Sequence, residues 1–174
     1  MKNLLILLTM LLFLSCANDD AKEAVAEEET AAKERSIGFL TSFPDDKLFL
    51  GTEAAIKIVK DLDHAWSSRD YEAMRPYLAD TAKFYFADGR SAKSSNDFLK
   101  IIEADYNEIE SWTFDMAYSV DLNPEIGGEH VQAGFTGISV EGSDTTKTYY
   151  HESYYVVDGK VITWNQYTQK EKKE

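Results

Sequence analysis

Cysteine and histidine are scarce in this chain. Cys16 is the only cysteine among 174 residues, so no intrachain disulfide can form. The three histidines, His64, His130 and His151, lie far apart in the sequence, and no pair of them has the spacing of metal ligands. We therefore expect neither a zinc or iron site nor a bound cofactor.

Several chemical motifs are also missing. The sequence has no glycine-rich phosphate-binding loop and no Gly-x-Ser-x-Gly nucleophile motif. Basic residues are outnumbered, because 18 lysines and arginines stand against 31 aspartates and glutamates, which gives a formal net charge of −13. A surface of this sign repels nucleic-acid phosphates and anionic lipid headgroups. We therefore expect no nucleic-acid partner.

Long apolar runs are confined to the N-terminus. The positive charge of Lys2 precedes an apolar run over residues 4–14, which is typical of a secretory signal and too short for a membrane-spanning helix. The run ends in the sequence Phe-Leu-Ser-Cys at residues 13–16, which resembles a bacterial lipobox. Phe13 departs from the leucine that is usual at the first lipobox position.

This resemblance implies that residues 1–15 are a lipoprotein signal peptide and that Cys16 becomes the lipidated N-terminus. Several acyl chains on one cysteine anchor a protein firmly, since each buried methylene contributes about 0.8 kcal/mol. We therefore expect a lipid-anchored protein of the bacterial cell envelope, on the periplasmic or surface face of the outer membrane. The alternatives are an ordinary signal peptide or a buried thiol. Loss of Lys2 with the signal peptide would leave 17 basic and 31 acidic side chains, a charge of −14.

The rest of the chain divides by composition into four parts. Residues 16–35 are rich in alanine, glutamate and lysine and lack the apolar side chains that offset the entropy of ordering, so we interpret them as an acidic tether. Residues 36–51 place phenylalanines and leucines around a Pro-Asp-Asp turn, which predicts an N-terminal arm packed on the domain. Residues 52–169 suit one domain with one core, and residues 170–174 form a charged tail.

Helical periodicity dominates the first half of the predicted domain. Thr52 is a candidate N-cap for a first helix whose apolar stripe ends near Trp66. A second, short helix is expected over residues 71–78. Ser94 or Ser95 is expected to cap a third helix.

The apolar period changes from helical to two after residue 111. Alternation predicts long strands over residues 112–120, 130–140, 147–157 and 161–168, and a brief strand is expected earlier, over residues 84–86. The alternation slips across Gly134 and Gly137, which predicts a bulge or a sharp bend in the strand that contains them. Helices followed by an antiparallel meander predict the α+β class.

Three stretches of the domain resemble the nuclear transport factor 2-like superfamily, particularly its SnoaL-like and ketosteroid isomerase-like branches. They are Ala-Trp-Ser-Ser-Arg-Asp-Tyr-Glu-Ala-Met at residues 65–74, Tyr-Leu-Ala-Asp-Thr-Ala at 77–82 and Tyr-Tyr-Val-Val-Asp-Gly-Lys-Val at 154–161. The resemblance covers roughly residues 52–168. It implies a cone-shaped domain (a cystatin-like roll) in which three N-terminal helices pack on a strongly curved antiparallel sheet. It also implies a pocket at the open end and a homodimer through the outer face of the sheet.

The residues that catalyse isomerisation in the ketosteroid isomerase branch are mostly replaced here. In that branch a first-helix tyrosine and a protonated acid stabilise an oxyanion, while a first-strand aspartate moves the proton. The matching positions in this chain are Leu62, Glu152 and Phe86. Because leucine and phenylalanine neither donate a hydrogen bond nor take a proton, we expect that this reaction is lost.

Glu152 is the remaining candidate for acid–base chemistry. Its tyrosine neighbours predict a poorly hydrated setting and a raised pKa. We favour the alternative, a carboxylate hydrogen-bonded to a tyrosine without turnover, because no second titrating group is evident.

The last hairpin decides which face of the sheet Glu152 takes. A two-residue type I′ loop at Asp158-Gly159 would place Glu152 opposite Asn165, whereas a type I turn with a glycine bulge over residues 157–159 would place it opposite Trp164. We choose the bulged turn because it gathers the better inner wall. On this face of the hairpin, Val156 and Ile162 accompany Tyr150, Glu152, Tyr154, Trp164 and Gln166. The residues that we predict to line the pocket are Trp66, Phe86, Tyr150, Glu152, Tyr154, Trp164 and Gln166.

Three functions are therefore open. The first is a module that binds a small, partly apolar ligand in an aromatic-lined pocket. The second is a SnoaL-like isomerase, hydratase or cyclase that uses Glu152 as acid or base with a partner such as Tyr85 or Tyr154. The third is a non-catalytic, dimerising structural domain whose cavity is filled by its own side chains. We favour the first and leave catalysis open, with Leu62 and Phe86 at the isomerase positions as the argument against it.

Overall fold

The computed structural model of the chain describes residues 38–40, 43–105, 111–141 and 144–171. The predicted signal peptide, Cys16 and the tether lie outside the described residues, so they stay predictions. Within the described ranges, no helix is both long enough and apolar enough to cross a membrane.

Three α-helices precede the long strands, as the periodicity predicts. They are α3 (Glu53–Ser67), α4 (Tyr71–Met74), which continues into a short 3-10 helix η1 (Arg75–Tyr77), and α5 (Ser95–Ala104). The expected caps are present: the Thr52 hydroxyl accepts a hydrogen bond from the Ala55 N–H, and the Ser94 hydroxyl accepts one from the Asp97 N–H. Both helices begin where a hydroxyl side chain satisfies a free N–H group of the first turn.

Eight strands form one mixed sheet in the order β1-β2-β5-β6-β7-β8-β3-β4. The strands are β1 (Gly38–Leu40), β2 (Phe43–Leu50), β3 (Leu78–Tyr85), β4 (Ser91–Ala92), β5 (Ser111–Asp121), β6 (Glu129–Glu141), β7 (Asp144–Val157) and β8 (Lys160–Lys170). Neighbouring strands are antiparallel except β3 and β8, which are parallel. The α+β class is confirmed, and the expectation of a wholly antiparallel sheet is corrected by this one pair.

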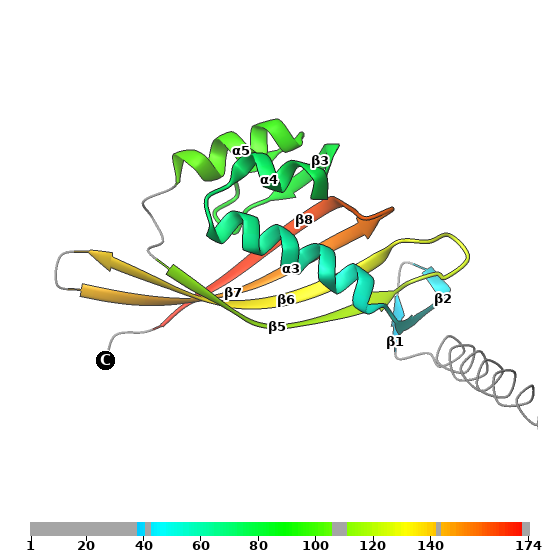
Figure 1. Cartoon of the computed structure of the whole chain (residues 1–174). Coiled ribbons are helices and arrows are strands. Elements are labelled where there is room, and N and C mark those ends of the chain that lie inside the picture. The colour runs from blue at the N-terminus through cyan, green and yellow to red at the C-terminus, as the bar shows by residue number, and fades with distance from the viewer. Residues whose placement is uncertain (1–37, 41–42, 106–110, 142–143, 172–174) are drawn as a thin grey trace, which may run out of the picture.

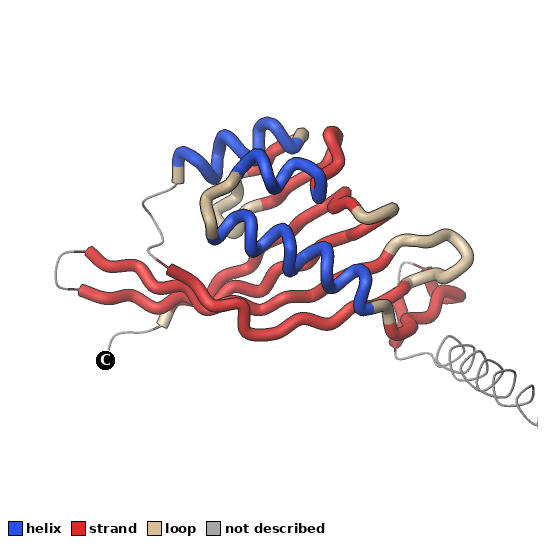
Figure 2. The backbone as a smooth tube through the Cα atoms, in the orientation of Figure 1, coloured by secondary structure: helices blue, strands red, loops and turns tan. Residues whose placement is uncertain are grey.

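The helices cover one face of the sheet and leave the other uncovered. Figure 1 shows α3 lying across the long strands while α4 and α5 cover the β3 end of the sheet, and Figure 2 shows the same layers by secondary structure. At the opposite edge, the predicted arm forms the hairpin β1–β2, and β2 pairs with β5 through Phe49 and Leu50. The arm therefore extends the sheet.

The predicted bulge lies in a neighbouring strand. The alternation of β6 is unbroken, because Val131, Ala133, Phe135 and Gly137 are all buried. The register instead shifts in β5 at Asp115, between the pair Phe114–Phe135 and the pair Met116–Gly134. The prediction was wrong about the strand because the pattern of β6 alone does not show where its partner inserts a residue.

The β7–β8 hairpin also differs from the prediction. Asp158 and Gly159 both have positive φ, 49° and 74°, and form a two-residue turn between the paired residues Val157 and Lys160. A bulge at Ile162 then shifts the register by one residue, since Val156 pairs with Val161 and Tyr155 with Thr163. Val161 therefore takes the buried place that we predicted for Ile162.

This second shift decides the face of Glu152. Glu152 pairs with Gln166, and Tyr154 pairs with Trp164. The type I′ turn alone would have placed Glu152 opposite Asn165, and the bulge restores the other face. The predicted face is present, although it arises from a different turn.

Candidate functional site

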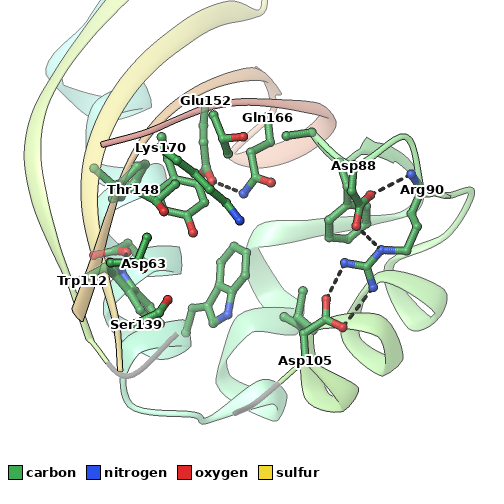
Figure 3. Close-up of a pocket in the computed structure, with 18 of the residues that line it drawn as sticks. Asp63, Asp88, Arg90, Asp105, Trp112, Ser139, Thr148, Glu152, Gln166 and Lys170 are labelled. Atoms are coloured by element: carbon green, nitrogen blue, oxygen red, sulfur yellow. Dashed lines mark hydrogen bonds and ion pairs between the residues drawn. The ribbon is translucent and has the colours of Figure 1, made fainter. Parts of the chain in front are cut away.

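A cavity of about 470 Å³ lies between the helices and the concave face of the sheet. Its wall comes from α3, α5, the loop after β3 and the four strands β5 to β8. Figure 3 shows the labelled side chains in three groups around the space: Glu152, Gln166 and Lys170; Asp63, Trp112 and Ser139; and Asp88, Arg90 and Asp105.

Six of the seven predicted pocket residues line this cavity. They are Trp66, Phe86, Tyr150, Glu152, Tyr154 and Gln166. Trp164 does not line it, which corrects the prediction. Its ring is 1% exposed and packs against Trp66, Phe86 and Phe98, behind the wall. Neither Leu62, which is buried in the core, nor Tyr85, which is 45% exposed, lines the cavity.

An aromatic cluster supports the wall. Phe84 stacks on Phe98 with ring centroids 4.0 Å apart, and Trp66 meets Phe98, Trp112 and Trp164 edge-on at 5.5 to 6.2 Å. Such edge-to-face pairs stabilise their geometry beyond area burial alone. The cluster packs Trp66 in the cavity wall against Trp164 behind it.

Glu152 is buried in β7 and is held by three neutral donors. Its Oε2 accepts hydrogen bonds from the Tyr154 hydroxyl and from Trp164 Nε1, the latter at 2.9 Å, and its Oε1 accepts one from Gln166 Nε2 at 3.0 Å. Burial raises the pKa of Glu152, and the nearby charge of Asp63 adds to this effect, while the three hydrogen bonds oppose it. Burial also raises the pKa of Tyr154, and the nearby charge of Glu152 adds to this effect.

Asp63 is the titrating residue that the sequence analysis missed. It projects from α3 into the same cavity and accepts a hydrogen bond of 2.8 Å from Trp112 Nε1. Burial raises its pKa too. One signal was available: Asp63 lies three residues before Trp66, so both share one side of the helix. Asp63 therefore joins Glu152 as a second cavity acid whose pKa is raised by burial, where the sequence indicated one.

Arg90 forms the opposite rim. Its guanidinium donates to both carboxylate oxygens of Asp105, at 2.9 and 2.7 Å, and to Asp88 at 2.5 Å, and it lies over the Phe86 ring. This bidentate pair joins the loop after β3 to the end of α5. No group of three potential metal ligands occurs in the described part of the chain.

Solved structures share this architecture. A protein of unknown function from Burkholderia pseudomallei, named NTF2-like, superposes with a TM-score of 0.54 at 12% identity, over 68% of this chain and 92% of that chain. The fold is nuclear transport factor 2-like. A candidate ketosteroid isomerase from Kribbella flavida superposes on this NTF2-like domain with a TM-score of 0.56 at 12% identity, over 72% of this chain and 84% of that one.

A third solved structure that superposes on this chain is the CaMKII hub of S. rosetta, with a TM-score of 0.57, 16% identity and coverage of 67% of this chain and 95% of that one. No family model matches the sequence, and no curated protein matches it significantly. At these identities the likeness establishes the fold alone. The function must be argued from the cavity.

Proposed function

We propose that this protein is a lipid-anchored module of the bacterial cell envelope that binds a small, partly apolar molecule in its cavity. The observation that carries the proposal is the cavity of about 470 Å³, since small-molecule sites measure roughly 300–1,000 Å³. Its wall combines aromatic rings with a few enclosed polar groups, the usual composition of such sites. The anchor rests on the sequence around Cys16 alone.

The open cavity also weighs against the structural alternative, in which the domain's own side chains fill the interior. The solved structures that superpose on this chain do not distinguish between these functions, because one is named a candidate ketosteroid isomerase and another a CaMKII hub. The argument therefore depends on what the cavity holds.

Native mass spectrometry of the mature protein from its own source tests the proposal. We expect a retained small molecule that Thr146→Phe displaces, because Thr146 lines the cavity and the larger ring would fill it. Thr145→Phe is the matched control, since Thr145 is exposed and adjacent strand residues point to opposite faces. Retention that is equal in both variants, or no bound molecule in the wild type, would contradict the proposal.

The pair of carboxyl groups favours acid–base catalysis as a second candidate. Acid–base enzymes commonly use two titrating groups in different environments, and Asp63 and Glu152 fit that description. A catalytic role predicts that the retained molecule changes in composition during incubation with the wild type. It also predicts that Glu152→Gln binds the molecule but does not convert it. If the molecule stays chemically unaltered in both proteins, catalysis is contradicted and binding remains as the function.

A homodimer through the outer sheet face stays part of the proposal. Met116, Tyr118 and Tyr167, on strands β5 and β8, are 47 to 62% exposed, and the helices do not cover that face. Exposed large side chains gathered on one face are typical of association sites. The dimer is tested by the same mass spectra, which would show twice the monomer mass.

A further inference from the structure

Asp63 and Glu152, two of the four acids that line the cavity, lie on different walls, and unlike Asp88 and Asp105 they are not paired with Arg90. The charge of the neighbouring His64 lowers the pKa of Asp63, but burial outweighs this effect. Asp63 comes from α3 and Glu152 from β7. Their hydrogen-bond donors, the Trp112 and Trp164 indoles, the Tyr154 hydroxyl and the Gln166 amide, are all neutral. Among the described residues, none of the ion pairs includes either acid. A buried carboxylate without a cation is costly, and a positive charge between these two would compensate both.

The basic side chains of the cavity wall do not supply this charge. Arg90 is engaged by Asp88 and Asp105 on the opposite rim, and the Arg69 guanidinium lies 5.3 Å from the centre of the Trp112 ring. Lys170 points toward the space between the walls in Figure 3, but its side chain is exposed and forms no ion pair with Asp63 or Glu152. Lys170 is therefore an exposed charge beside the cavity and does not form an ion pair with half-buried Asp63 or with buried Glu152.

The rest of the wall also suits a cation. The faces of tryptophan and tyrosine rings attract positive charge, and Trp66, Trp112 and Tyr150 all line the cavity. The net charge of −13 raises the local concentration of cations around the whole molecule. A metal ion fits poorly, because the described residues contain no group of three potential ligands.

We propose that the cavity selects a small organic cation with an apolar body, its ammonium group seated between Asp63 and Glu152 and its body against Trp66 and Trp112. This inference rests on the proposed function, because it names the class of molecule that the same cavity binds. A bound ammonium also lowers the pKa of both acids toward ordinary values, since it favours their charged forms.

Three matched compounds test the charge preference: phenylbutylamine, phenylbutanol and phenylbutyrate, which share one apolar body and carry a positive, zero and negative charge. The chain contains three tryptophans. Trp66 and Trp112 line the cavity and Trp164 donates to Glu152, so intrinsic fluorescence reports binding there. Titrations of the mature chain at high salt, which screens adsorption to the acidic surface, should give roughly tenfold tighter binding of the amine than of the alcohol.

Single substitutions test which acidic residue causes the preference for the amine. Asp63→Asn should reduce the preference for the amine to below about threefold. Asp61→Asn removes a half-exposed acid that pairs with Lys57 on the same helix and does not line the cavity, so it should leave the preference unchanged. Lys170→Gln should strengthen amine binding, because it removes a competing charge beside the cavity. Circular dichroism confirms that each variant is folded.

Equal or tighter binding of phenylbutanol or phenylbutyrate would overturn the inference, and so would weaker amine binding in Lys170→Gln. These outcomes leave the proposed function intact if native mass spectrometry finds a molecule that Thr146→Phe displaces. The two proposals therefore fail independently.

Discussion

Glu152 couples folding to pH through its enclosure. Burial raises its pKa in the folded chain, whereas in the unfolded chain it returns to the ordinary glutamate value near 4.5. Between these two values the folded state binds more protons than the unfolded state. The stability of the fold therefore decreases as pH rises through this window, and the contribution of protonated Glu152 is lost above the folded pKa.

Glu152→Gln should remove this pH dependence. A glutamine keeps a carbonyl that can accept from Tyr154 and Trp164, and it carries no charge to bury. We expect its free energy of unfolding to fall less than that of the wild type between acidic and neutral pH, measured by urea denaturation at a series of pH values. Glu125→Gln, in an exposed loop, is the control and should follow the wild type. Parallel curves for Glu152→Gln and wild type would contradict the assignment.

At the scale of elements, the last hairpin decides the composition of the wall. Its turn needs left-handed backbone at both Asp158 and Gly159, and aspartate and glycine are residues that tolerate it. The bulge at Ile162 then sets the register that brings Gln166 opposite Glu152. Two local irregularities therefore determine which side chains meet in the cavity.

Gly159→Ala should destabilise the domain by roughly 1–2 kcal/mol, the cost of a left-handed alanine. The added methyl would meet only Ile58 Cδ1, at the ordinary contact distance of 3.9 Å, so the loss is conformational and not steric. Gly159→Asn should lose less, because asparagine tolerates positive φ. Thermal and urea unfolding of the three proteins measure the effect. Equal losses in both variants would indicate a packing cause instead.

Strand β5 shows how a pattern can mislead at this scale. Its alternation predicts Trp112, Phe114, Met116 and Tyr118 on one face, but the bulge at Asp115 divides them. Trp112 and Phe114 pack toward the core, and Met116 and Tyr118 are half-exposed on the outer face. A bulge changes the face of every later residue, and hydrophobic alternation alone does not locate it.

At the scale of the whole molecule, we propose that a lipid anchor at Cys16 joins the cavity domain to a membrane through residues 16–35. Cys16→Ser should abolish lipidation and move the protein from the membrane fraction to the soluble fraction, since serine has no thiol to acylate. Incorporation of labelled palmitate and cell fractionation measure this. Ser15→Ala is the control, because it keeps a small residue before the cysteine. Membrane association that persists in Cys16→Ser would contradict the lipoprotein prediction.

The sequence by itself determined the α+β class, the starts of the helices at Thr52 and Ser94, and the long strands, because caps and apolar periods act between residues close in the chain. It also pointed to six residues of the cavity wall. Only the tertiary structure decided that β3 pairs in parallel with β8 and that Asp63 lines the same cavity as Glu152. Those features depend on the register between segments far apart in the chain, where one inserted residue exchanges the two faces of a strand.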